Sequence, residues 1–247
     1  MEDTKDNLTI KFVVLGWYYD KYEELIDGLI EMKNGNPGIV DVFYSCHREP
    51  IDKVKENFGW KLFENKGLEW GGYQQAFEHL DIKDNEIYFF INDDLVIKNW
   101  DFVNRCISMF NGGSKVIGNG SNYGFYLDPE KVIVHEADEP IPWGTVTKWI
   151  DEVKEENQHI FDEPLHHKTI RGSFIAIKGK SLKEINGFEV ANCPYEKEDK
   201  TQEFGNVSLN MFGYKISKIF GNDFIDYLGR EYANSEYIYE PTGENRY

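Results

Sequence analysis

The clearest chemistry in this sequence belongs to two adjacent carboxylates, Asp93 and Asp94. They follow the hydrophobic run Ile87–Ile91 with only Asn92 between. An extended backbone sends adjacent side chains to opposite sides, so one carboxylate can accept hydrogen bonds from a ligand while the other binds a hard cation. Such cations prefer oxygen ligands and often take only one or two protein carboxylates. An Asp-Asp pair is also common in turns and at helix starts, but its position after a strand-like run favours a binding site.

Three other segments follow predicted strands, and in open α/β sheets ligands bind at the carboxyl ends of strands. These segments are Gly16-Trp17-Tyr18, Ser45-Cys46-His47-Arg48 and Asn65-Lys66-Gly67. They supply a flat aromatic ring, hydrogen-bonding groups and a glycine that allows close approach. Together with Asp93 and Asp94 they provide the parts needed to hold a base, a ribose and a metal-bound diphosphate.

The first half of the chain alternates apolar strands with amphipathic helices. The hydrophobic pattern predicts strands at 10–15, 39–44, 60–63 and 87–91, and helices near 22–30, 51–58, 73–80 and 103–110. The breaker Asn34–Gly38 ends the first helix. Alternation of this kind implies an α/β fold with parallel strands and helices on both faces.

The second half is less regular. We predict strands at 115–118, 132–134, 169–177 and 214–219, with helices at 146–153 and 201–212. The last 25 or so residues lack periodicity and are expected to wrap the surface. Because no repeat or low-complexity linker interrupts the chain, one domain is the simpler expectation.

Composition narrows the classes of partner. The 247 residues hold 44 acidic and 27 basic side chains, a net charge of −17, which argues against binding nucleic acid or an anionic membrane. A phosphorylated ligand stays compatible, because a divalent metal can supply positive charge locally. The aromatic fraction of 15% fits a core of large side chains and sites that stack on bases and sugar rings.

The cysteines and the N-terminus indicate a cytoplasmic protein. Cys46, Cys106 and Cys193 are far apart and form no CxxC pattern, so neither a disulfide framework nor a zinc site is expected. The polar residues 1–6 do not resemble a signal peptide. No apolar run approaches the roughly 20 residues of a membrane span, so no integral membrane segment is expected.

Four segments resemble, in order, the nucleotide-sugar glycosyltransferases of the GT-A fold, especially the large family 2 group. Phe89–Asp94 resembles the strand and DXD-type motif. Val13–Tyr18 resembles the first strand and donor-binding loop, and Asn65–Gly67 with Gly71–Ala76 resembles the Asn-x-Gly helix start. Arg171–Ile177, followed by Asn186–Glu189, resembles the acceptor-side strand and its Gly-Gly-Phe turn.

The resemblance implies a Rossmann-like nucleotide-binding sheet in one GT-A domain. Residues 10–120 would bind the nucleotide-sugar, 121–220 would form the acceptor and catalytic half, and 221–247 a C-terminal extension. Asp94 would bind Mn²⁺ or Mg²⁺ and Asp93 the donor. Asn92 stands where the family more often has Asp, which puts metal dependence in doubt. With the strand-end segments, the expected donor-binding residues are Gly16, Trp17, Tyr18, Ser45, Asn65, Gly67, Gly72 and Asp93.

The resemblance also implies a late carboxylate as catalytic base. In inverting members an Asp or Glu lies near the start of a late helix that leads into Gly-Tyr, which matches Gly213-Tyr214. Upstream stands Gln202–Asn206 in place of a clean Glu-Asp pair, so Glu203 is the first candidate, with Asp199 and Glu198 as alternates. Solvated surface charge is an equally good interpretation of each.

Other residues carry weaker predictions. Trp17 would stack on a base or pack the sheet edge, with packing slightly favoured. His166 and His167 would be structural or solvated in preference to contacting phosphate or metal. Trp143 would form an acceptor platform or plug an ordered loop. The sequence contains no P-loop, no Gly-x-Gly-x-x-Gly and no Gly-x-Ser-x-Gly motif.

The resemblance therefore implies an inverting, metal-assisted glycosyltransferase of the hexosyl- or pentosyltransferase class, with a nucleotide-sugar donor, commonly UDP-linked, and a glycan or glycoconjugate acceptor. One alternative is a sugar nucleotidyltransferase, but Gly16–Asp20 lacks the glycines and the basic residue of its phosphate loop. A second alternative is a non-catalytic relative that binds carbohydrate or nucleotide.

Overall fold

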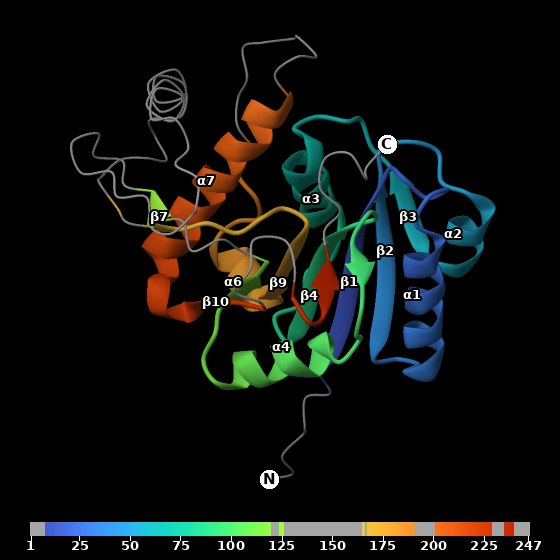
Figure 1. Cartoon of the computed structure of the whole chain (residues 1–247), viewed down its shortest axis with the longest axis horizontal. Helices are drawn as coiled ribbons and strands as arrows, with labels where there is room; N and C mark the ends of the chain where they lie inside the picture. The colour runs from blue at the N-terminus through green and yellow to red at the C-terminus, as the bar shows by residue number, and fades with distance from the viewer. Residues whose placement is uncertain are drawn as a thin grey trace.

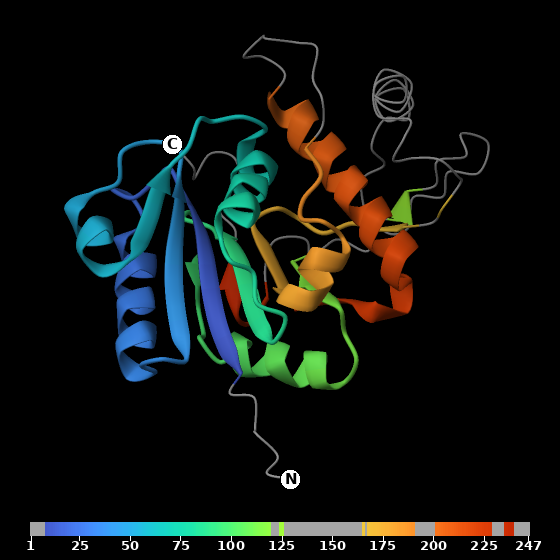
Figure 2. The same cartoon turned by 180° about the vertical axis from the view of Figure 1, so that it is seen from behind.

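A computed structural model of the chain describes residues 8–119, 124–125, 165, 167–190, 201–228 and 235–239. For residues 124–125 and 201–207 the description covers the backbone alone. Figures 1 and 2 show a central sheet with helices on both of its faces.

Seven strands form the central sheet within the described residues, in the order β3-β2-β1-β4-β9-β6-β10. Their bounds are β1 Thr9–Gly16, β2 Val40–Cys46, β3 Gly59–Leu62, β4 Glu86–Asn92, β6 Val116–Gly118, β9 Phe174–Lys178 and β10 Ile225–Tyr227. The described helices are α1 Glu23–Gly35, α2 Asp52–Asn57, α3 Leu68–His79, α4 Phe102–Asn111, α6 Gly179–Glu184 and α7 Thr201–Phe220. The expected α/β sheet is therefore present, and the strand order reverses between β1 and β4.

Side chains along the central strands alternate between two apolar clusters, one on each face. In β4, Phe89 belongs to the cluster that α1, α2 and α4 cover, whereas Phe90 belongs to the cluster that α3, α6 and α7 cover. This alternation follows from the two-residue period of a strand. Both faces of β4 are covered, which explains why its sequence is an unbroken hydrophobic run.

Aromatic side chains contribute to both clusters, and in the second cluster five of their rings meet. Phe188 lies at the centre, with ring centroids 4.6 Å from Phe90, 5.3 Å from Phe212, 5.5 Å from Tyr73 and 6.2 Å from Trp70. These five rings, called the aromatic joint below, connect β4 and α3 with α7 and the turn after α6. Ring pairs at such distances add to the stabilisation that area burial gives.

Strand β9 runs antiparallel to both of its neighbours, β4 and β6, whereas β1, β2, β3 and β4 pair in parallel, as expected for the first half. The Arg171 amide donates to the Asn119 carbonyl at 2.9 Å, so the segment after β6 returns to the end of the sheet where β6 finished. A chain that re-enters at that end can only run back. Parallel pairing would need a crossover to the opposite end.

The predicted strand at 214–219 is wrong, because these residues belong to α7. Buried Tyr214 and Ile216 alternate with polar neighbours, which resembles a strand locally. Over a longer window, buried Phe212 and Ile216 lie four residues apart, which is helical spacing. The strand that completes the sheet is β10, in the segment expected to form an extension; it pairs in parallel with β6.

Two small ribbons complete the described architecture. Strand β7 (Gly124–Phe125) pairs with β8 (His167–Lys168), and β11 (Ile238–Tyr239) pairs with β5 (Val96–Ile97). The predicted elements at 132–134 and 146–153 lie outside the described residues. No helix in the described part of the chain has the length and apolar character needed to cross a membrane.

Candidate functional site

The candidate site lies where β1 and β4 end side by side. Leu15 is in register with Asn92, and the Asp93 amide donates to the Leu15 carbonyl at 3.1 Å. The chain then turns, and Asp93 Oδ2 accepts from the amides of Trp17 at 2.6 Å and Tyr18 at 2.5 Å. One carboxylate therefore fixes the backbone that follows β1, and we call this arrangement the Asp93 latch.

Burial sets the protonation of the latch. Only 4% of Asp93 is exposed, and this burial raises the pKa of its carboxyl to about 7. The neighbouring carboxylate of Asp94 raises the pKa further, while the hydrogen bonds from the two backbone amides and the Arg48 guanidinium lower it. Positive charge brought to this edge by a ligand would favour the ionised form.

Asp94 is the second carboxylate of the site, with 2% of its surface exposed. It occupies the turn after β4, immediately before Leu95 and β5. Within the described ranges, no three His, Cys, Asp or Glu side chains gather as a cation site. A metal here would therefore take few protein ligands and would have to share its coordination with a ligand's phosphates and water.

Asn92 is held by the helix that packs behind it. Its Oδ1 lies 2.8 Å from the Tyr73 hydroxyl, which is also 2.6 Å from the Gly172 carbonyl oxygen. The main-chain amide of Asn92 donates to the Ser173 carbonyl at 3.1 Å. Asn92, at the motif position where the family more often has Asp, thus links β4 to α3 and to the segment before β9.

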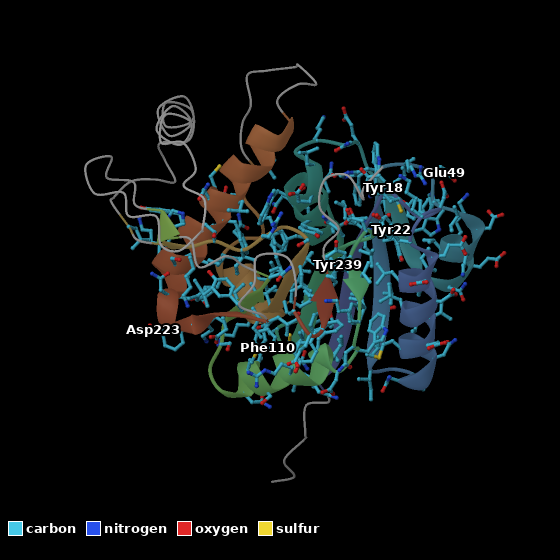
Figure 3. The ribbon with its side chains drawn as sticks, viewed as in Figure 1. Tyr18, Tyr22, Glu49, Phe110, Asp223 and Tyr239 are labelled. Atoms are coloured by element: carbon cyan, nitrogen blue, oxygen red, sulfur yellow. The ribbon has the colours of Figure 1, made fainter. Side chains whose placement is uncertain are left out.

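Trp17 and Tyr18 face outward from the latch. Trp17 is 38% exposed, so the slightly favoured prediction that it packs the sheet edge is wrong. Tyr18 is half-buried and meets the Tyr22 ring edge-on at 6.4 Å. Figure 3 shows Tyr18, Tyr22 and Glu49 at the same end of the molecule, beside the ends of β1 and β2. An exposed indole at this place is suited to stacking on a flat ligand.

Three predicted donor-binding residues have packing roles in the structure. The Ser45 hydroxyl is fully buried and donates to the Gly72 carbonyl at 2.9 Å. A Cβ on Gly72 would lie 2.3 Å from the Leu15 side chain, and one on Gly16 would lie 2.3 Å from the Tyr19 hydroxyl. Direct contact of these residues with a donor stays a prediction.

The Asn65–Gly67 segment immediately precedes α3, with Gly67 at its N-cap. Gly67 has a φ of +78°, a left-handed conformation that favours glycine, and a Cβ there would lie 2.3 Å from Val190. Asn65 is exposed and open to a ligand. The sequence pattern therefore located a real helix start, with a structural reason for the glycine.

Of the three catalytic base candidates, only Glu203 lies within the described residues. Glu203 falls in the first turn of α7, where the backbone alone is described, while Asp199 and Glu198 lie outside the described residues. Figures 1 and 2 show α7 beginning at the end of the molecule where β1 and β2 finish. Gly213 and Tyr214, expected to follow the helix, lie inside it.

His167 is 1% exposed, its Nε2 lies 3.3 Å from Asn210 Oδ1, and its ring packs edge-on against Tyr214. These contacts give it a structural role. His166 and Trp143 lie outside the described residues.

Sequence reasoning gave no role to two residues at this edge. The Arg48 guanidinium lies 5.3 Å from the Tyr19 ring centroid and donates to Asp20 at 2.8 Å, which positions a cation beside the latch. Asn119 is fully buried where β6 ends, and among the described residues its side-chain amide has no hydrogen-bond partner. Arg48 was within a strand-end segment already, whereas no local pattern marks Asn119.

No family model and no curated protein matches this sequence. Among solved structures, glucosyl-3-phosphoglycerate synthase from Mycobacterium tuberculosis, in complex with Mn²⁺ and UDP-glucose, is similar over 96% of this chain and 73% of its own, with a TM-score of 0.51 and 12% identity. A mannosyltransferase from Pyrobaculum calidifontis, in complex with GDP-mannose and Mn²⁺, is similar over 73% of this chain with a TM-score of 0.43 and 12% identity.

This chain spans about half of the mannosyltransferase, 47% of its length. At such identities the likeness concerns the fold alone. With the observed strand order, it establishes the GT-A fold that the motifs predicted.

Proposed function

We propose that this protein is a glycosyltransferase that moves a sugar from a nucleotide-sugar onto a hydroxyl of a glycan or glycoconjugate. One observation carries the proposal: two buried carboxylates end β4, and one of them latches the exposed aromatic turn that ends β1. The edge thereby joins a stacking surface to a pair of acidic groups. The glucosyl-3-phosphoglycerate synthase of similar fold was solved with UDP-glucose and Mn²⁺, which supports the same class of donor here.

The donor is assigned along this edge from base to sugar. The base, uracil by family preference, stacks on Trp17, and the ribose reaches the Asp93 oxygen that does not hold the loop. The diphosphate lies at Asp94. Arg48 is near enough to influence the Asp93 carboxyl and offers a donor to the nucleotide. In a protein of net charge −17, a local cation helps to admit an anionic ligand.

The chemistry of the donor set fits a divalent metal. Asp94 offers carboxylate oxygens from a buried turn, and Mg²⁺ or Mn²⁺ commonly binds through one or two carboxylates together with substrate phosphates. When bound, the metal would stabilise the negative charge of the departing diphosphate. Asp94 is its ligand in this proposal, and Asp93 keeps its place as donor contact.

Transfer then needs a base for the acceptor. In our proposal a carboxylate near the start of α7, Glu203 first and Asp199 or Glu198 otherwise, takes the acceptor hydroxyl proton. The acceptor oxygen forms a bond to the anomeric carbon as the bond from that carbon to the phosphate oxygen breaks. The nucleoside diphosphate leaves with the bonding electron pair, and the configuration inverts.

The proposed division of labour follows the chain. Residues 10–120 hold the nucleotide-sugar, 121–220 the acceptor and the base, and 221–247 extend the domain. An enzyme that catalyses this transfer belongs to the hexosyl- or pentosyltransferase class. Cys46 and Cys106 are buried free thiols, which fits the reducing cytoplasm as the place of action.

Calorimetric titration of UDP and of GDP, each with and without Mn²⁺, tests the proposal. We expect one nucleotide to bind with a dissociation constant on the order of micromolar, and Mn²⁺ to strengthen that binding. Absence of binding under all four conditions would contradict the proposed donor site.

The variant Asp94→Asn sharpens the same titration. Removing a ligand carboxylate should weaken Mn²⁺-supported binding by about a hundredfold, at the upper end of what even indirect metal-site partners cost. Asp84→Asn is the matched control, because that carboxylate is exposed in an ion pair with Lys183. Wild-type affinity in Asp94→Asn would remove Asp94 from the site.

A further inference from the structure

The C-terminal part of the chain returns to the segment that follows the acidic pair. Strand β11 pairs antiparallel with β5, and β5 begins two residues after Asp94. Figure 1 shows the two strands side by side over one face of the sheet, and Figure 3 places Tyr239 there. Residues 235–239, called the C-terminal clasp below, thus lie next to the proposed metal-binding turn in space while being distant in sequence.

Main-chain bonds join the clasp to the β5 segment. The Tyr237 carbonyl accepts from the amides of Lys98 at 2.7 Å and Asn99 at 3.1 Å. The Lys98 ammonium donates to the Ser235 carbonyl at 3.0 Å and lies 5.6 Å from the Tyr239 ring centroid. The two bonds to the Tyr237 carbonyl are made by backbone amides, so they fix the path of the chain whichever side chains Lys98 and Asn99 carry.

The clasp has a well-defined conformation of its own. The Ser235 hydroxyl accepts from the amides of Tyr237 at 3.2 Å and Ile238 at 3.1 Å. The Ser235 amide donates to the Ile238 carbonyl at 2.9 Å. A serine that bonds the backbone two and three residues on stabilises a tight turn, so the clasp presents β11 to β5 in one register.

Ile238 anchors the clasp in the core. It is fully buried in the same apolar cluster as Leu95, the residue after Asp94. Ile97 and Tyr237 pack against that cluster from β5 and from the clasp. Among the described strands, β5 pairs with β11 alone. The turn that carries Asp94 is therefore fixed on one side by β4 and on the other by a partner from the end of the chain.

We propose that the C-terminal clasp is a positioning element for Asp94, and that metal-supported nucleotide binding requires it. This inference rests on the proposed function. Ile238 acts through Leu95 and β5, and contacts no ligand. The aromatic turn at Trp17 is held by Asp93 from the other side, so loosening the clasp should affect the metal end of the donor site and spare the base end.

The test uses the full-length protein with Ile238→Ala and Ile238→Val. Nucleotide affinity is measured with and without Mn²⁺, using whichever of UDP and GDP the wild type binds. For Ile238→Ala we expect the Mn²⁺-supported gain in affinity to fall at least tenfold, with the metal-free affinity within twofold of wild type. Ile238→Val should restore the gain, and Ile219→Ala, at a 40% exposed site, is the control.

A second variant serves if Ile238→Ala does not fold: Ser235→Ala removes the hydroxyl that shapes the clasp and leaves the core intact. An unchanged Mn²⁺-supported gain in the folded variants would overturn the inference. Equal losses with and without Mn²⁺ would overturn it as well, because they indicate general destabilisation.

Amide hydrogen exchange separates this inference from the proposed function. The Leu95 amide donates to the Asn92 carbonyl at 3.2 Å, within the turn itself. If the clasp positions this turn, Leu95 exchange should accelerate several-fold in Ile238→Ala without any nucleotide. If the wild-type protein binds no nucleotide, the proposed function is contradicted. If Leu95 exchange is unchanged in Ile238→Ala, only the inference about the clasp is contradicted.

Discussion

The edge at β1 and β4 and the region around α7 are held in place by different forces. At the edge, backbone amides donate hydrogen bonds to the buried Asp93 carboxylate and to the Leu15 carbonyl, with donor–acceptor distances of 2.5 to 3.1 Å. Helix α7 instead docks through the aromatic joint, where Phe212 meets Phe188 and Trp70 ring to ring. The first arrangement fixes a geometry tightly and tolerates little substitution. The second depends on volume and shape, so it tolerates substitutions that conserve the volume of the core.

The largest expected effect tests the α7 side. Glu203→Gln should lower the transfer rate by about a hundredfold to ten-thousandfold, because a general base contributes that much, while donor affinity stays at its wild-type value. Single-turnover transfer and nucleotide titration measure the two quantities. Glu184→Gln, an exposed position on α6, is the control. Unchanged turnover would move the base to Asp199 or Glu198.

The aromatic joint can be broken directly. Phe188→Ala removes a ring that is 3% exposed and should lower the free energy of unfolding by about 3–5 kcal/mol, measured by urea denaturation. Phe224→Ala, at a site 46% exposed, should change stability by less than about 0.5 kcal/mol. Equal effects of the two would mean that the rings do not join the two regions.

Two variants of Asp93 separate what its hydrogen bonds contribute to stability from what its charge contributes. Asp93→Ala leaves the part-buried amides of Trp17 and Tyr18 without their acceptor and should lower the free energy of unfolding by up to about 1–3 kcal/mol for each unsatisfied group. Asp93→Asn retains an acceptor oxygen and should cost much less. Thermal unfolding in the absence of metal compares them. Similar destabilisation by both variants would show that the carboxylate charge, and not the two bonds, holds the loop.

The smallest effect concerns pH. Burial of His47, partly opposed by its contact with Gln75, holds its pKa below 6.5 in the folded state. As pH falls through about 6.5, the unfolded state binds the proton first, so the free energy of unfolding decreases. Between pH 7.5 and 5.5, wild type should therefore lose more stability than His47→Gln. Identical losses would exclude His47 from the pH dependence.

Local pattern was enough to predict the ends of β1, β2 and β4 to within two residues. Short strands with buried residues on both faces, each followed by a polar or glycine-containing segment, identify the ends of β1, β2 and β4 without tertiary information. The direction of β9 could not be predicted, because it depends on where residues 119–173 begin and end in space. Strand β10 was not predicted, because its three residues carry too little periodicity.

Side-chain roles at the edge were harder to predict than its position. Trp17 and Ser45 both follow or end strands, yet one is exposed and the other has its hydroxyl buried against Gly72. Asn119 shows the same limit, because burial of a lone amide is a property of the packed molecule. The register between β11 and β5 joins residues that lie far apart in the sequence, which no local window can show.

The position of β9 also has a consequence for synthesis of the chain. Strand β4 pairs with β1 on one side, but the residues that pair with its other side, Phe174–Lys178, leave the ribosome much later. Until then a nascent chain exposes an unpaired, strongly hydrophobic strand edge, which is a template for misassociation. The second edge of β4 thus stays unpaired until β9 is made, and chaperone protection would matter most during that interval.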